Sequence, residues 1–194
     1  IVTSDQIAEV FWPGRSQKKY LANRRLRVLY DLHCIDRYFP PVEKGSSPQH
    51  IVLDRAGAKI LDLQKFRKIR SLPNTYEHTT LTTDFIIKAR EYGFTDPERE
   101  YKIGPIQCDI YYPKVAVEID RGTESHKTLQ RKGRSYNRAT DLRRVIFVTS
   151  GADQRIRSFF KYIHGTKKAG SHFRDLDLLL KNLTSKQKLV YNNK

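Results

Sequence analysis

The sequence contains little cysteine, relatively few acidic residues and no long apolar segment. Its two cysteines, Cys34 and Cys108, are too few to build a disulfide framework in a chain of 194 residues. No run of 18 or more apolar residues occurs, so we expect neither a membrane-spanning helix nor a membrane partner. The first residues lack the charged and then apolar segments of a signal peptide. We therefore expect a cytoplasmic protein.

Basic residues outnumber acidic ones along the whole chain. There are 37 Lys and Arg against 21 Asp and Glu, which gives a formal net charge of +16. Residues 1–70 carry 14 basic and 7 acidic residues, and residues 71–194 carry 23 and 14, so the excess is not confined to a tail. This charge predicts a polyanionic partner, by default double-stranded DNA. Solubility alone, or an anionic membrane surface, would be a less specific explanation of the same charge.

The first 64 residues show the order helix, helix, strand, strand, helix. Thr3 or Ser4 is expected to cap a short helix, and Ser16 a longer one that follows Pro13-Gly14. The segments "CIDRYFPP" and "QHIVLD" predict two strands, which are joined by the turn-rich loop "VEKGSSP". Asp54 is expected to cap a last short helix. This order predicts a winged helix-turn-helix domain at residues 1–64.

The longer helix of this domain carries its basic residues opposite an apolar face that includes Leu21, Ala22 and Leu26. In a winged helix, such a polar face enters the major groove, where Lys and Arg bind phosphates and Arg pairs with guanine. The predicted DNA-binding residues are those on this face and a lysine at the tip of the wing: Lys18, Lys19, Tyr20, Arg24, Arg27 and Lys44. A merely solvated helix face would carry the same charge. Its coincidence with the helix-turn-helix-wing order favours DNA contact.

The rest of the chain predicts a linker and a second domain. Residues 65–80 are basic, contain Pro73 and have few apolar anchors, as expected of a linker. From residue 81 on we predict the elements in this order: a helix "TTDFIIKAREYGF" capped by Thr82 or Thr83, a polar loop "TDPEREYK", strands "IQCDIYY" and "VAVEID", a helix from about Thr123 to Ala139, a strand "RVIFVTS", and helices "ADQRIRSFFKYIHG" and "DLDLLLKNL". This pattern predicts an α/β domain at residues 81–194, with a small mixed sheet flanked by helices. The overall fold class is therefore α+β.

Carboxylates gather where two of these strands precede a helix. Glu118 and Asp120 alternate with apolar residues, so they point to the same face of their strand. A turn centred on Pro113 and Lys114 would also place Asp109 opposite Glu118 on the neighbouring strand. Three carboxylates on one patch repel one another unless a cation lies among them.

Two kinds of cation fit this patch. Asp109, Glu118 and Asp120 are of the residue types that hold Mg²⁺, which would activate water for phosphodiester hydrolysis. Alternatively, Lys132 neutralises Glu118 or Asp120 in a structural ionic network. Lys132 shares the inward face of the next helix with Gly133, which would allow a close approach to the sheet. We expect Lys132 to be the main partner and a metal ion the weaker one.

Two further side chains are expected beside this patch. Glu124 lies at the turn before the helix, and Tyr136 follows Lys132 by one helical turn. A covalent attack on DNA by Tyr136 is a third possibility for the chemistry of this region. The sequence does not support it, because it has no His pair or metal-binding His triad, and His126 stands alone.

Three stretches resemble the replication-relaxation family of plasmids and conjugative elements: "RRLRVLYDLHCIDR", "SSPQHIVLDRAGAKIL" and "VEIDRGTESHKTLQRKGRSY". The resemblance extends over about residues 3–150. Its more specific part is the E-x-D-x-G-T-E run followed by the K-x3-Y spacing. Members of this family are linked to plasmid replication, DNA relaxation and mobilisation, which implies the same themes here.

The C-terminal half also resembles the PD-(D/E)xK nuclease fold. This resemblance places Asp109 at the Asp of the motif and Glu118 at its second acidic position. Two residues depart from the pattern, because Cys108 stands where the motif prefers Pro and Asp120 replaces the catalytic Lys. Some nucleases carry that Lys on the neighbouring helix, where Lys132 is suitably placed. If the domain is a nuclease, the implied catalytic residues are therefore Asp109, Glu118, Asp120 and Lys132.

Three hypotheses about function follow. The first is a DNA-binding protein of a plasmid or mobile element that acts in replication, relaxation, mobilisation or their regulation, alongside a relaxase or replication protein. The second is a DNA endonuclease that depends on Mg²⁺. The third is a transcription repressor whose C-terminal domain forms a homodimer or senses a ligand. The sequence favours DNA binding over catalysis, and DNA binding requires no cofactor.

Overall fold

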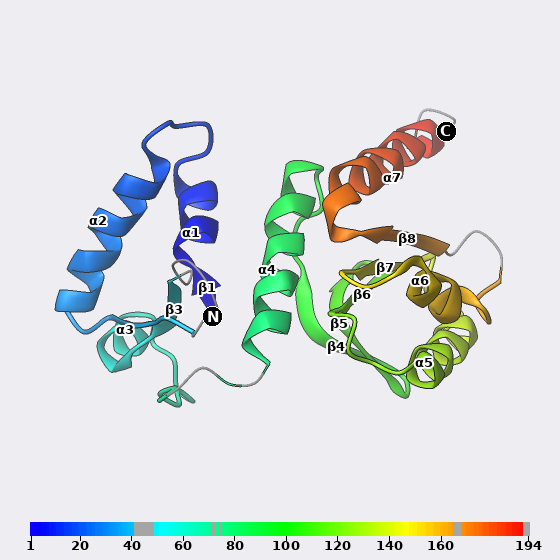
Figure 1. Ribbon diagram of the computed structural model, residues 1–194, viewed down its shortest axis with the longest axis horizontal. Helices are drawn as coiled ribbons and strands as arrows, with labels where there is room; N and C mark the ends of the chain where they lie inside the picture. Colours follow the sequence, from blue (N-terminus) through cyan, green and yellow to red (C-terminus); the bar gives the residue numbers. More distant parts are fainter. Residues whose placement is uncertain (41–48, 71–72, 74, 165–167, 192–194) are drawn as a thin grey trace. The chain divides into compact units, whose positions relative to one another are not determined.

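The computed structural model describes residues 1–40, 49–70, 73, 75–164 and 168–191, the last eight by their backbone alone. The chain divides into two compact units, residues 1–84 and 85–194. Within the described residues it contains seven α-helices and two sheets, which confirms the predicted mixed α+β class (Figure 1). None of the helices described is both long and apolar enough to cross a membrane.

The first unit contains a three-stranded antiparallel sheet in the order β1-β3-β2. Its complete elements are β1 (Val2–Thr3), α1 (Ser4–Phe11), α2 (Lys18–Asp31), β2 (Ile35–Tyr38), β3 (His50–Leu53) and α3 (Arg55–Ile60). The predicted order of helices and strands is present, with the short strand β1 added before it. The buried core of this unit joins α2 to the sheet through Leu26, Cys34, Ile35 and Ile51.

The first two helices begin in different ways. Thr3 caps α1 in a capping box, in which Thr3 Oγ1 accepts from the Gln6 amide and Gln6 Oε1 accepts from the Thr3 amide. The prediction that Ser16 caps α2 is wrong, because the cap is Gln17, which makes no side-chain cap hydrogen bond. Ser16 lies inside a turn closed by the Lys18 amide and the Arg15 carbonyl (3.2 Å), so the helix starts only after it.

The second unit contains a five-stranded mixed sheet in the order β4-β5-β6-β7-β8. The elements from α4 to the end of the described chain are α4 (Tyr76–Glu91), β4 (Glu98–Ile103), β5 (Ile106–Tyr112), β6 (Val115–Asp120), α5 (His126–Arg138), β7 (Arg144–Thr149), α6 (Asp153–Phe160), β8 (Lys168–His172), a 3-10 turn (Phe173–Asp175) and α7 (Leu176–Tyr191). Strands β4 to β6 are antiparallel neighbours, and β6 to β8 are parallel. Helices α5 and α6 are therefore the crossovers between parallel strands.

Two strands of this sheet were missed by the sequence analysis. The polar segment that we expected as a loop is β4, an exposed edge strand that pairs with β5. Strand β8 is the opposite edge, with the short sequence "KAGSH". Edge strands face solvent on more than one side, so they lack the apolar alternation from which a strand is predicted.

Helix α4 begins at Tyr76, six residues before the predicted cap. Thr82 and Thr83 lie inside the helix, where their hydroxyls donate to the carbonyls of His78 (2.8 Å) and Thr79 (2.9 Å). A threonine that bonds back to the preceding turn is tolerated within a helix, so the cap pattern was misleading. The chain is therefore helical across the boundary between the two compact units.

The segment predicted as a linker is held to the first unit at both ends. Lys68 Nζ lies 2.9 Å from a carboxylate oxygen of Asp36 and 2.9 Å from one of Asp54. Further along, the Gln6 side-chain amide donates to the main-chain carbonyl of Thr80 (3.0 Å) and so ties α1 to α4. Neither contact could be predicted from composition, which suggested a poorly anchored segment.

Helices α5 and α6 cover one face of the five-stranded sheet (Figure 1). The core on this face consists of buried apolar side chains from strands and helices: Ile106, Cys108, Ala116, Leu129, Tyr136, Leu142, Val145, Phe147, Phe159, Phe160 and Ile163. A Cβ at Gly133 would lie 2.1 Å from the Phe159 carbonyl oxygen. The close approach predicted at Gly133 is therefore to α6 and not to the sheet.

Candidate functional site

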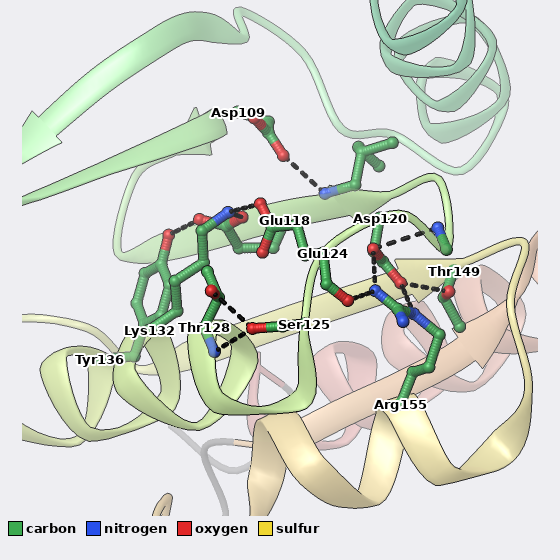
Figure 2. Close-up of polar contacts among 12 residues, drawn as sticks. Asp109, Glu118, Asp120, Glu124, Ser125, Thr128, Lys132, Tyr136, Thr149 and Arg155 are labelled. Carbon is green, nitrogen blue, oxygen red and sulfur yellow. Dashed lines mark hydrogen bonds and ion pairs between the residues drawn. The ribbon is translucent and has the colours of Figure 1, made fainter.

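The polar side chains of β6 point toward the helices that cover the sheet (Figure 2). Glu118 and Asp120 are 2% and 4% exposed, so both carboxylates lie almost entirely out of water. An isolated buried carboxylate is strongly disfavoured, and each must therefore have partners. The structure provides them from two different helices.

Glu118 is bound by two side chains of α5. Lys132 Nζ lies 3.0 Å from Glu118 Oε2, and the buried Tyr136 hydroxyl donates to Glu118 Oε1. Burial and the negative charge of Asp109 raise the pKa of Glu118 to about 7, although Lys132 and Tyr136 act against this rise. Burial and the adjacent Glu118 also raise the pKa of the Tyr136 hydroxyl. The predicted pairing of Glu118 with Lys132 is confirmed.

Lys132 has a second partner in Glu124, which lies in the turn between β6 and α5. Its Nζ is 2.8 Å from Glu124 Oε1. Burial lowers the pKa of Lys132, but the two carboxylates outweigh this and hold it above its ordinary value. Within the described residues, the buried Glu124 Oε2 has no hydrogen-bond partner. Lys132 therefore pairs with two carboxylates, one from β6 and one from the turn that follows it.

Asp120 is bound from α6 and from β7, not by Lys132. Arg155 Nε and Nη2 approach the two Asp120 carboxylate oxygens at 2.5 and 2.8 Å, and the Thr149 hydroxyl donates at 2.6 Å. Burial raises the pKa of Asp120, but the hydrogen bonds from Arg155 and Thr149 outweigh it and hold the pKa below its usual value. The prediction that Lys132 would neutralise Asp120 is therefore wrong.

Arg155 also joins the two networks of Figure 2. Its Nη2 donates to the main-chain carbonyl of Glu124 (2.7 Å), whose side chain holds Lys132. A planar guanidinium with donors in a fixed fork suits this arrangement, because it binds a carboxylate on one side and a carbonyl beside it. The β6–α5 connection is thus fastened to both helices.

Asp109 lies beside this network, on the strand next to the one that carries Glu118. The register of β5 and β6 pairs Tyr112 with Val115, as the predicted turn requires. Asp109 Oδ2 accepts a hydrogen bond of 2.7 Å from the main-chain amide of Ile119. Asp109 therefore supports the strand next to Glu118 and contributes negative charge to its surroundings.

The observed partners do not favour a metal site here. Among the residues that the structure describes, no group of three or more His, Cys, Asp or Glu side chains could hold a metal ion. Arg155 and Thr149 occupy the Asp120 carboxylate, while Lys132 and Tyr136 occupy that of Glu118. As placed, these side chains do not fit Mg²⁺. The Tyr136 hydroxyl is also fully buried, which leaves it no access to DNA.

The predicted DNA-binding residues of α2 fall into two groups. Lys18 and Lys19 pair with acidic residues of α1, at 2.5 Å from Glu9 and 3.1 Å from Asp5. The others are exposed on the outer side of the helix: Tyr20, Arg24 and Arg27. Lys44, the predicted wing residue, lies outside the described residues.

Two residues of the buried network were missed by the sequence analysis. Thr149 is the β7 partner of Asp120 in the parallel register, and Arg155 comes from a helix 35 residues further along the chain. A polar residue at the end of a buried apolar strand was the available signal for Thr149. The sequence offered no comparable signal for Arg155, because many exposed helices carry arginine.

Comparison with known proteins gives one family match. A family described as replication-relaxation matches residues 1–145, which is about three quarters of the chain and includes residues of both compact units. The searches of curated proteins and of solved structures gave no match. The matched region contains the outer face of α2 and the whole of β5, β6 and α5, but not Thr149 and Arg155, the partners of Asp120. The chain therefore belongs to the replication-relaxation family.

Proposed function

We propose that this protein binds double-stranded DNA of a plasmid or other mobile element and acts in its replication, relaxation or mobilisation. The family points to these processes. A net charge of +16, spread over both halves, suits a nucleic-acid partner. A relaxase or a replication protein is the expected protein partner at such a site, and a homodimer would suit a DNA site with two-fold symmetry.

The observation that carries this proposal is the exposed outer face of α2. Tyr20, Arg24 and Arg27 have the spacing i, i+4, i+7, so they form one exposed stripe. The helix lies in the order helix, helix, strand, strand, helix with a small antiparallel sheet, as in a winged helix-turn-helix. In that arrangement a helix with free arginines inserts into the major groove.

Lys18 and Lys19 have a different role in this proposal. Their ion pairs with Glu9 and Asp5 hold α1 against the start of α2. Exposed pairs of this kind contribute little to stability, and DNA phosphates could replace the carboxylates at small cost. Base and backbone recognition is therefore assigned first to Arg24 and Arg27.

For the second unit we propose a nuclease-like fold that does not cleave DNA. Three antiparallel strands, a helix and a parallel strand follow one another here, as in the PD-(D/E)xK fold. Asp109 and Glu118 lie on neighbouring strands and Lys132 on the helix, as in the migrated form of that motif. Arg155 binds both carboxylate oxygens of Asp120, so this charge is neutralised by a cation of the same chain.

The test of DNA binding compares two double variants of the full chain on duplex DNA. Arg24→Ala with Arg27→Ala should raise Kd by about 30-fold or more, because two arginine contacts with DNA, each of ~1–3 kcal/mol, are lost. The matched control is Arg55→Ala with Lys59→Ala, which removes the same charge from the exposed side of α3. Equal Kd values for both double variants, at every salt concentration, would contradict the assignment of α2.

The same reactions distinguish the endonuclease alternative. Duplex and supercoiled DNA incubated with the protein and Mg²⁺ should stay intact. Cleavage that needs Mg²⁺ and disappears in Asp109→Ala and in Glu118→Ala would instead identify a nuclease. The Asp120→Ala variant would then show whether the pair with Arg155 suppresses or supports that activity.

A further inference from the structure

The outer face of α5 carries a row of cations that the network described above does not use. Lys127, Arg131, Arg134 and Arg138 have the spacing i, i+4, i+7, i+11, and all four are exposed. At 100° per residue they fall within a stripe about 60° wide. Leu129, Gly133 and Tyr136, the buried residues of this helix, lie on its opposite side. We call these four cations the α5 stripe.

The composition of α5 is unusual for a solvated helix face. Its thirteen residues include five Lys or Arg and no Asp or Glu. Solvent-facing helices are commonly stabilised by pairs of opposite charge at i, i+4, whereas like charges at this spacing repel by about 0.2–0.5 kcal/mol per pair. The α5 stripe contains only such repulsive neighbours, so its charge works against the helix in isolation.

Within the described part of the chain, no acidic side chain pairs with Lys127, Arg131 or Arg138 to offset this repulsion. Lys127, Arg131 and Arg138 make no ion pair or side-chain hydrogen bond with any residue that the structure describes. The fourth member, Arg134, lies over the ring of Tyr162, with its guanidinium carbon 4.1 Å from the ring centroid. Lys161 Nζ lies 5.4 Å from the same centroid, which adds a further cation beside the stripe.

We propose that the α5 stripe is a second DNA-contacting surface, which binds the phosphate backbone of a duplex without reading its sequence. At 1.5 Å per residue, the stripe is about 16 Å long. Phosphates of one strand recur about every 3.4 Å along the duplex axis, so the stripe passes about five of them. This inference rests on the proposed function, since the ligand is again duplex DNA.

A backbone-binding role accounts for the residue types. Lys and Arg on an exposed helix can each neutralise a phosphate, while the stripe presents no Asn, Gln or aromatic side chain for base edges. The contact with the Tyr162 ring restricts the rotation of the Arg134 side chain, which stays exposed. The surface is therefore suited to affinity and orientation, with sequence discrimination left to α2.

The experiment measures the salt dependence of duplex binding by the full chain. The test variant is Lys127→Ala with Arg131→Ala and Arg138→Ala, which spares the contact of Arg134 with Tyr162. The control removes three exposed cations elsewhere in the same unit: Arg99→Ala, Lys102→Ala and Arg174→Ala. Circular dichroism melting curves confirm that both triple variants fold.

The test variant should bind random-sequence duplex more weakly, with a slope of log K against log salt smaller by about 2.7 for three lost phosphate contacts. Between about 50 and 200 mM salt, the ratio of its Kd to that of the unmodified protein should consequently fall by about 40-fold. The control variant should keep the original slope. A test variant whose slope equals that of the control would overturn the proposal.

Two further outcomes have definite meanings. If the α5 variant is unchanged while Arg24→Ala with Arg27→Ala weakens binding, the proposed function stands and the α5 inference is wrong. If the α5 variant loses binding to anionic phospholipid vesicles but not to duplex DNA, the stripe is a membrane-surface contact, and the inference is again overturned.

Discussion

Lys132 is the residue on which the buried charges of β6 most depend. It bridges Glu118 and Glu124 from a single ammonium group, and its side chain is 31% exposed. Glu118 has an alternative to this ion pair, since burial and Asp109 raise its pKa to about 7, against an ordinary 4.5. The Glu118 carboxyl therefore becomes neutral when the pH falls below about 7.

The pH dependence of a Lys132→Ala variant follows from this raised pKa. Folding favours the protonated form of Glu118 between about pH 4.5 and 7, so the stability from this group falls as the pH rises through that range. At pH 8 the variant should lose about 2–4 kcal/mol, below the ~3–5 kcal/mol of a fully buried pair because Lys132 is partly exposed. At pH 5 the loss should be much smaller, since Glu118 then carries a proton.

Urea unfolding at both pH values measures this difference. Lys127→Ala, five residues earlier on the same helix and exposed, is the matched control and should stay within about 0.5 kcal/mol of the unmodified protein. An equal loss for Lys132→Ala at pH 5 and pH 8 would show that the ionisation of Glu118 is not what Lys132 stabilises.

At the scale of elements, the backbones of α5 and α6 approach each other closely at Gly133. Gly133 faces the Phe159 carbonyl so closely that a Cβ would lie 2.1 Å from that oxygen. Phe159 also stacks on Phe147 of β7 with ring centroids 4.3 Å apart, so α6 cannot move away without opening the core. The pair Arg155–Asp120 fastens the same helix to β6.

A Gly133→Ala substitution should therefore destabilise the second unit by about 1–3 kcal/mol through this clash. Helix propensity alone acts the other way, because alanine in a helix is favoured over glycine by about 1 kcal/mol. Ser135→Ala, two residues further on the same helix, should change the stability by no more than about 0.5 kcal/mol. A thermal melt in which Gly133→Ala is the more stable protein would mean that α5 and α6 can separate freely.

At the scale of the whole molecule, the segment predicted as a linker, residues 65–80, combines anchored and exposed residues. Lys68 is held by Asp36 and Asp54, and the Tyr38 hydroxyl donates to the Ile69 carbonyl (2.8 Å). Arg70, which follows directly, is exposed. Proteases need several residues of accessible backbone, which the contacts of Lys68 and Ile69 restrict.

Limited trypsin digestion should thus cut first after Arg70 and leave two resistant fragments. Mass spectrometry of early time points identifies the bond. An Arg70→Gln variant should lose this early cut, whereas Lys59→Gln, an exposed change on α3, should keep it. A first cut after Lys68 would show that its two ion pairs do not protect the chain.

Local patterns in the sequence determined most of the elements and one half of the buried network. The alternation in residues 115–120 predicts β6, and helical spacing aims Lys132 at Glu118, because both patterns depend only on neighbours along the chain. The edge strands β4 and β8 were not predictable in this way, since their residues face solvent and bury no regular apolar face.

The partners of Asp120 were decided by the tertiary structure alone. Thr149 reaches this carboxylate because β7 lies parallel to β6 in register, and Arg155 because the chain then crosses back over the sheet as α6. A sequence shows which charges will be buried, since burial follows the apolar pattern around them. It does not show which distant cation will meet each one, because that depends on strand order and helix packing, which are set by the whole core.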